Sequence, residues 1–167
     1  MKALPCLTLA AIAALSGLSR AQSAEKSAEK KDASHVSASE SSAREKLVGA
    51  WRLAWMEEPG PDGKVHRITD RKGMLLYTGD GHMSVQIMFP KSESALSNEY
   101  VQGGYEASFG SYEVNEEAHT LTHHVEGSVT RGLVGKDLPR VFQLSDGQLI
   151  IKSSRPDEHW SVAWEHY

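Results

Sequence analysis

The chain has 167 residues, of which 18 are Lys or Arg and 22 are Asp or Glu, so its formal net charge is −4 at pH 7. Because no stripe of Lys and Arg interrupts this acidic balance, the sequence argues against nucleic acid or an anionic membrane as a partner. The single cysteine, Cys6, lies near the N-terminus, which excludes disulfides, thiolate metal sites and a cysteine nucleophile from the rest of the chain.

Residues 1–21 have the pattern of a secretory signal peptide. Lys2 supplies a positive charge, residues 4–18 are rich in Ala and Leu, and residues 19–21 place small side chains at the two positions that a signal peptidase reads. We therefore expect cleavage before Gln22 and an exported protein, either periplasmic or secreted. The apolar stretch is short for a membrane span, so no membrane insertion is expected after the signal is removed.

Residues 22–44 are dominated by Ala, Ser, Glu and Lys, and Val36 is their only large aliphatic residue. A segment of this composition cannot bury a core, so we interpret it as a flexible, disordered linker. Residues 45–167 remain, which is enough for one domain with a single core.

This domain contains nine segments with strand character, separated by turns of Gly, Asp and Asn. They are residues 48–56, 64–69, 73–78, 82–89, 105–114, 120–128, 140–145, 148–154 and 159–167. The third and fourth are joined by Gly79-Asp80-Gly81, which is typical of a hairpin. Residues 44–47 suggest a short lead-in helix, and residues 91–104 a loop or short helix over one end. Short, evenly spaced strands predict an all-β fold, an antiparallel up-and-down barrel of eight or nine strands.

Six segments of the domain resemble the lipocalin-like domain family, within the calycin group of β-barrels. They are LVGAWRL (47–53), LYTGDGHMSVQ (76–86), FGSYEV (109–114), THHVEGS (122–128), RVFQL (140–144) and WE (164–165). The resemblance implies a barrel with a central cavity but no settled activity. In the wider group an arginine stacks on the tryptophan that Trp51 matches, which implies Trp51 and Arg140 as a structural plug. The chain departs from the pattern at His166, where an arginine is expected.

The stretch from Thr122 to Glu126 carries the most chemistry. Neighbouring strand residues face opposite sides, and His123 shares its side with Leu121 and Val125, which indicates that His123 points inward. There it would act as an acid or base, hydrogen-bond a ligand, or bond a Tyr or Ser of a neighbouring strand. A slip of one residue would put His124 inward instead.

The candidate ligand-binding residues combine aromatic, Met and polar side chains of the strands, and core packing is the alternative for each. They are Tyr77, Met83, Gln86, Phe109, Tyr112, His123, Phe142 and Trp164. We expect no cofactor. We also expect no metal, because His119 and His123 would lie about 13 Å apart on one strand.

Three functions remain open from the sequence. The first is an exported barrel, a monomer or weak homodimer, that binds one small hydrophobic molecule without catalysis. The second is an isomerase, cyclase or dehydratase that uses His123, with Glu126 or a tyrosine such as Tyr112, for proton transfer. The third is a filled barrel that acts as a protein-interaction module of the cell envelope.

Overall fold

The computed structural model of the protein describes residues 42–145 and 147–167. The predicted signal peptide and nearly all of the predicted linker lie outside these residues. The strands are β1 (Gly49–Pro59), β2 (Val65–Ile68), β3 (Lys72–Tyr77), β4 (His82–Met88), β5 (Tyr105–Asn115), β6 (Thr120–Ser128), β7 (Asp137–Ser145), β8 (Gln148–Ser153) and β9 (Ser161–His166).

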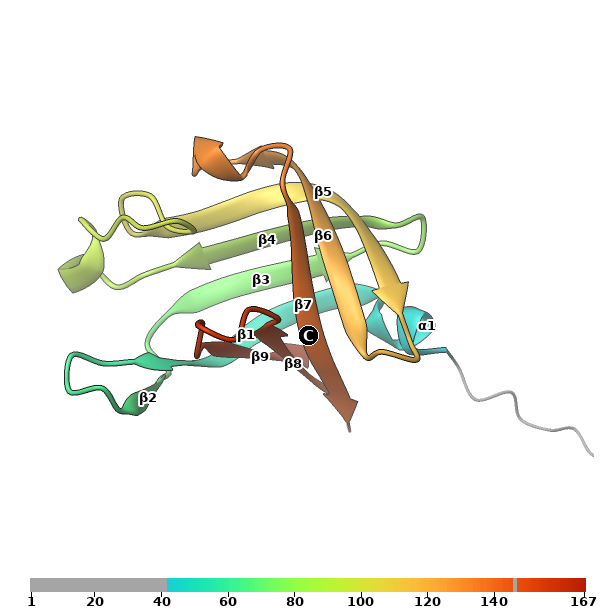
Figure 1. The fold of residues 1–167 in the computed structure, drawn as a ribbon, viewed down its shortest axis with the longest axis horizontal. Helices are drawn as coiled ribbons and strands as arrows, with labels where there is room; N and C mark the ends of the chain where they lie inside the picture. The colour runs from blue at the N-terminus through green and yellow to red at the C-terminus, as the bar shows by residue number, and fades with distance from the viewer. Residues whose placement is uncertain (1–41, 146) are drawn as a thin grey trace, which may run out of the picture. The chain divides into compact units, whose positions relative to one another are not determined.

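The nine strands pair in the order β2-β1-β3-β4-β5-β6-β7-β8-β9, all antiparallel, and β1 also pairs with β9. Eight strands therefore close into an up-and-down barrel, and β2 is an additional strand along the far end of β1 (Figure 1). The predicted all-β barrel of eight or nine strands is confirmed.

Buried and exposed side chains alternate along the strands, as the pleat requires. In β4, Met83, Val85 and Ile87 are buried, whereas Gln86 and Met88 are exposed. The hairpin between β3 and β4 turns at Gly81, whose φ of 96° is a left-handed conformation that glycine adopts without strain. The core of the protein is therefore the interior of the barrel.

One end of the barrel is closed by the short helix α1 (Ala43–Leu47) (Figure 1). Ser42 and Glu45 form a capping box, in which each side chain accepts a hydrogen bond from the other residue's backbone N–H, at 3.1 and 3.0 Å. The carbonyl of the buried Leu47 accepts the indole N–H of Trp51 at 2.8 Å. This hydrogen bond fixes α1 to β1 at the end of the barrel that the helix closes.

Trp51 is fully buried at this end, and its aromatic neighbour is His166, with ring centroids 3.7 Å apart. Arg140 does not stack on Trp51, contrary to the expectation from the resemblance. Arg140 of β7 pairs with Ser153, the last residue of β8. From there the chain continues to the opposite end of the barrel. The partner of Trp51 is the residue at which the chain departs from the family pattern.

Three connections gather at the opposite end of the barrel. They are the lid (residues 91–104), which begins with the 3₁₀ helix η1 (Lys91–Glu93), the β6–β7 connection with η2 (Arg131–Leu133), and the β8–β9 connection (residues 154–160). The lid corresponds to the segment predicted to cover one end. No helix in the described ranges is long and apolar enough to cross a membrane.

Candidate functional site

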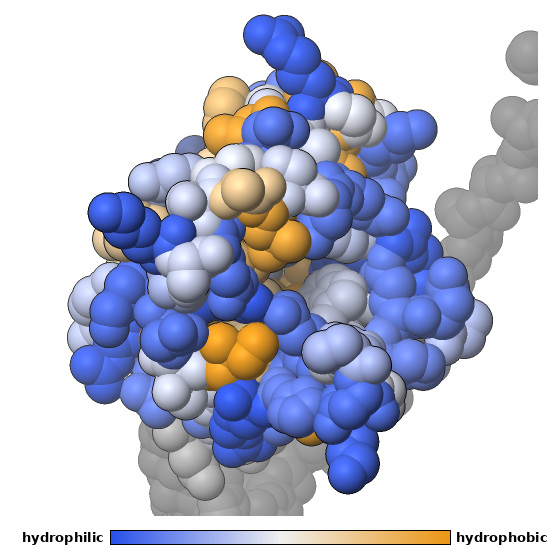
Figure 2. All heavy atoms as spheres, turned by 90° about the vertical axis from the view of Figure 1, so that its left-hand side faces the viewer, coloured by the Kyte–Doolittle hydropathy of each residue, from blue (hydrophilic) through white to orange (hydrophobic). Residues whose placement is uncertain are grey.

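A cavity of about 370 Å³ lies inside the barrel toward the lid. Its apolar wall consists of Met56, Pro59, Leu75, Val85, Ile87, Phe89, Leu96, Val101, Leu133, Leu138, Ile151, Trp160, Val162 and Trp164. Its polar lining consists of Glu58, Asn98, Tyr100, Glu106, Ser108, His123 and Arg140. Figure 2 looks at this end and shows apolar residues in the middle of a largely hydrophilic surface. The site is therefore an apolar chamber with a few polar groups.

His123 is buried in β6, on the inward side that the alternation of the sequence predicted. Its Nε2 forms a hydrogen bond with the phenolic oxygen of Tyr77, at 2.7 Å. Burial, together with the electrostatic effects of the neighbouring Arg140 and His124, lowers the pKa of His123 to about 3. Burial also raises the pKa of Tyr77. Both groups are consequently uncharged at neutral pH.

Arg140 is the cation of the cavity, and only 6% of the residue is exposed. Its guanidinium lies over two aromatic rings, 5.3 Å from the centroid of Tyr100 and 4.9 Å from that of Trp160. Nη1 donates a hydrogen bond of 3.3 Å to the carbonyl of Pro139. Among the described residues, no carboxylate lies within ion-pair distance of this guanidinium. The charge is held by π-systems and one backbone carbonyl.

Glu106 is the acid of the cavity. It lies in β5 opposite the buried Ile87 of β4, so its side chain is on the inward face. Burial raises the pKa of Glu106 to about 7, although the positive charges of Arg140 and Arg71 act in the opposite direction. This carboxyl therefore changes its charge near neutral pH.

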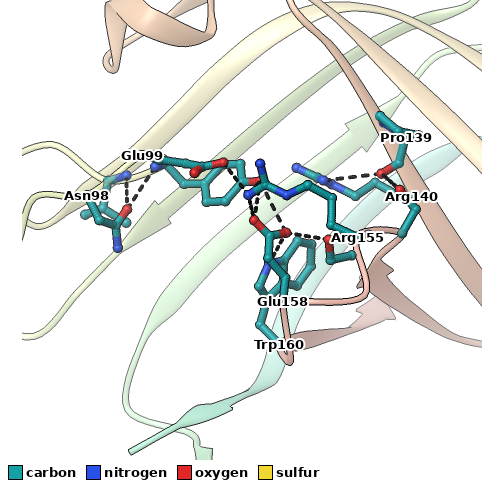
Figure 3. A network of polar contacts seen from close by, with 11 residues as sticks. Asn98, Glu99, Pro139, Arg140, Arg155, Glu158 and Trp160 are labelled. Carbon is teal, nitrogen blue, oxygen red and sulfur yellow. Dashed lines mark hydrogen bonds and ion pairs between the residues drawn. The ribbon is translucent and has the colours of Figure 1, made fainter.

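The lid is connected to the β8–β9 connection by a polar network, which Figure 3 shows from close by. Arg155 pairs with Glu99 of the lid at 2.6 Å and also with Glu158. Glu158 accepts hydrogen bonds from the hydroxyl of Tyr100 at 3.2 Å and from Nε1 of Trp160 at 3.1 Å. The network thus orients both aromatic rings that hold Arg140.

A second cluster fixes the start of the lid to β1. The side chain of Arg71, 2% exposed, donates to both oxygens of Glu58 at 2.8 Å and to Glu93 at 2.9 Å. Its guanidinium also lies 4.0 Å from the centroid of the Phe89 ring. Because Glu58 and Phe89 line the cavity, this cluster is part of the chamber wall.

The residues predicted for ligand binding fall into three groups. His123 and Trp164 line the cavity, and Tyr77 lies behind His123 as its hydrogen-bond partner. Met83, Tyr112 and Phe142 are buried in the core but are not part of the cavity lining.

Gln86 and Phe109 are on the outer face. Gln86 is exposed and pairs with Met74, which is also exposed, and Phe109 is 57% exposed and packs over Gly127. Glu126, predicted as a helper of His123, is exposed as well. It is the extra residue of a β-bulge, because Gly127 and Val125 pair with consecutive residues of β5.

The sequence reasoning missed Glu106, Tyr100 and Trp160 as residues of the site. A signal for Glu106 was present, since residues 106, 108, 110 and 112 share one face of a strand and Tyr112 was expected inward. Tyr100 lies in the lid and Trp160 in a connection, where no periodicity marks an inward side. Within the part of the chain that the structure describes, no three His, Cys, Asp or Glu side chains are grouped so that they could hold a metal ion.

Comparisons with known proteins identify one family and several solved structures similar to this chain. The model of a family described as a lipocalin-like domain matches residues 48–165. A lipocalin-like protein from Bacteroides uniformis is 14% identical, with a TM-score of 0.47, over 73% of this chain and 99% of that chain. A protein from Bacteroides eggerthii is 16% identical, with a TM-score of 0.44, over 72% of this chain and 99% of that chain. A variant of the fluorescent protein UnaG is 16% identical, with a TM-score of 0.38, over 74% of this chain and 97% of that chain. No curated protein matches the sequence.

Proposed function

The chain belongs to the lipocalin-like domain family, and on this premise we propose that it binds one small, largely hydrophobic molecule inside the barrel without transforming it. The observation that carries the proposal is the apolar chamber of about 370 Å³ beneath the lid. Sites for small molecules are concave, mostly apolar, and contain a few polar groups that orient the ligand. The volume lies within the range of about 300–1,000 Å³ that is usual for such sites.

The placement of the chamber supports binding rather than packing. Most of its wall consists of strands whose backbones are fixed by pairing with a neighbour on each side, so the space exists without a ligand and little order is lost on binding. The end with α1 is filled by Leu47 and Trp51, both fully buried. A molecule therefore enters from the lid end. A cavity of this size also argues against a filled barrel that acts only as an interaction module.

Proton transfer is a second candidate function, and a specific observation favours it. The groups first suspected are poorly suited, because His123 has a pKa of about 3 and Glu126 is exposed. Glu106, with a pKa of about 7, is matched to acid–base work at neutral pH. An isomerase, cyclase or dehydratase in this barrel would use Glu106. If the protein converts a retained molecule and the Glu106→Gln variant does not, the protein is an enzyme and the proposal of binding without catalysis is wrong.

Export is the other part of the proposal. It rests on the charged start, the apolar stretch and the small residues that precede Gln22. The check is the N-terminal residue of the protein recovered from cell fractions and medium. A mature chain that begins at Gln22, outside the cytoplasm, supports export, and an intact Met1 in the cytoplasm contradicts it.

Binding is tested first by native mass spectrometry of protein purified gently from its own compartment, and then with N-phenylnaphthylamine, a neutral apolar fluorophore. Ser108→Trp fills the chamber, because Ser108 lines it. Ser84→Trp is the matched control, since Ser84 pairs with the exposed residues Leu76 and Phe109 on the outer face. We expect Ser108→Trp to lose the probe and Ser84→Trp to keep it. Equal binding by both variants would contradict a site inside the barrel.

A further inference from the structure

We infer, on the basis of the proposed function, that the bound molecule is an amphipathic acid whose carboxylate is held by Arg140, and that its binding brings a proton to Glu106. The inference concerns the lid-end part of the chamber, where both residues line the same space.

Arg140 has donors to spare. A guanidinium carries five N–H groups, and in the described residues Arg140 uses two of them at most, one for the carbonyl of Pro139 and one for the hydroxyl of Tyr100. Arg140 lines the chamber, and none of its nitrogens is among the fully enclosed polar atoms without a partner. A buried charge without a counter-ion is costly, and a ligand carboxylate would supply both the counter-charge and acceptors for two parallel hydrogen bonds.

The aromatic contacts keep this donor set in place. The guanidinium lies over the rings of Tyr100 and Trp160, and contacts with ring faces do not use its N–H groups, which point outward in the plane of the group. Both rings are themselves fixed by Glu158. An anion at Arg140 would therefore meet a pre-organised cation.

The other polar groups of the chamber do not compete for the anion. His123 and Tyr77 satisfy each other at 2.7 Å and are uncharged. Glu58 is held by Arg71 in a bidentate pair. An amine would be repelled by Arg140, and a neutral molecule would leave the guanidinium without a counter-ion.

Glu106 couples this anion to a proton. The titratable and charged groups that border the chamber with it are Glu58 from β1, Tyr100 from the lid, His123 from β6 and Arg140 from β7. The charge of Arg71 also acts on Glu106. A ligand carboxylate on Arg140 places a second negative charge near Glu106 and neutralises the cation that favours its ionised form. Both changes favour the protonated carboxyl, so Glu106 takes up a proton from water when the acid binds.

The first experiment compares decanoate with decanol, which share one chain and differ in the head group, by isothermal titration calorimetry on the purified protein. We expect decanoate to bind at least tenfold more tightly. Arg140→Met should remove this preference and leave decanol binding within threefold. Arg140→Lys, which keeps the charge, should retain part of it. Arg52→Met is the matched control, because Arg52 pairs with Glu165 on the outer surface.

The second experiment repeats the decanoate titration in buffers with different ionisation enthalpies, which gives the number of protons taken up. We expect uptake of about half a proton at pH 7 and close to one at pH 8, with the affinity falling up to tenfold per pH unit above pH 7. Glu106→Gln should abolish both the uptake and this dependence on pH.

The outcomes separate this inference from the proposed function. Binding of decanol that equals that of decanoate, unchanged by Arg140→Met, would overturn the acid and leave the apolar chamber as a binding site. Tight decanoate binding without proton uptake would overturn the role of Glu106. Failure of decanoate, decanol and N-phenylnaphthylamine alike would overturn the proposed function itself.

Discussion

The phenolic oxygen of Tyr77 in β3 lies 2.7 Å from Nε2 of His123 in β6, in the interior of the barrel. These strands are not neighbours, since β4 and β5 lie between them. The ring of Tyr112 from β5 lies beside that of Tyr77, with centroids 4.6 Å apart. The pair therefore joins two walls of the barrel across the core and gives two buried polar groups a partner.

Replacing Tyr77 by Phe should destabilise the protein, because the substitution leaves Nε2 of a buried imidazole without its partner. The expected loss is about 1–3 kcal/mol in the free energy of unfolding, measured by urea denaturation. Tyr77→Phe combined with His123→Phe removes both partners, and a coupling of about 0.5–3 kcal/mol in the double-mutant cycle is expected. Strictly additive losses would mean that the hydrogen bond contributes nothing to stability.

His123 should make the fold sensitive to acid. Its pKa is about 3 in the folded protein, against an ordinary value of 6.5, so below pH 6.5 the unfolded chain binds a proton that the native chain does not. The stabilisation is therefore full above pH 6.5 and is lost as the pH falls toward 3, at up to about 1.4 kcal/mol per pH unit. Unfolding of the wild type and His123→Gln at pH 7, 6 and 5 measures this contribution by difference. Parallel profiles would contradict it.

Glu106 should change the stability of the fold with pH in the direction opposite to His123. Its pKa is about 7 in the folded protein, against an ordinary value of 4.5, so stability is lost as the pH rises from 4.5 to 7. Glu106→Gln should therefore be more stable than the wild type at pH 8 by about 1–3 kcal/mol and equal to it near pH 4. Glu113→Gln, on the outer side of the same strand and 82% exposed in its side chain, is the control. A Glu106→Gln variant no more stable at pH 8 would refute the prediction.

The sequence predicted the barrel well because strands leave a local signal. Alternation placed His123 inward, and glycine-rich turns marked the hairpins. The face of Gln86 and Phe109 was misjudged, since polar and aromatic side chains suit either side of a half-buried strand. The bulge at Glu126 and the partner of Arg140 depend on pairing between distant segments. The lid and the β8–β9 connection, which contribute Tyr100 and Trp160, have no periodicity from which a direction could be predicted.

Trp51 should matter for stability and not for the ligand. It is fully buried against His166 and Leu47 at the end away from the chamber, and it is not part of the cavity lining. Trp51→Ala should cost about 3–5 kcal/mol and lower the melting temperature by about 10 °C or more, measured by circular dichroism. His166→Ala should cost less, because His166 is exposed on its other side. Unchanged melting of Trp51→Ala would remove its role as a plug.

Arg71 should control how often the lid opens. It binds Glu58 of β1 and Glu93 of η1 at once, so it is the direct link between the barrel wall and the start of the lid. Arg71→Met removes both ion pairs together with the guanidinium that lies over the Phe89 ring, and it leaves two carboxylates close together. We expect faster hydrogen exchange in residues 91–104 and faster release of N-phenylnaphthylamine, with little change in exchange in β6 and β7.

The control for this effect is Arg67→Met, which removes an exposed pair with Glu57 on β1 and leaves the lid contacts intact. Because exposed ion pairs contribute about 0–1 kcal/mol, this variant should match the wild type in both measurements. Faster exchange throughout the barrel of Arg71→Met would mean general destabilisation and not opening of the lid. Release rates equal to those of Arg67→Met would mean that molecules pass the lid without breaking the Arg71 pairs, and access would then lie between the lid and the β8–β9 connection.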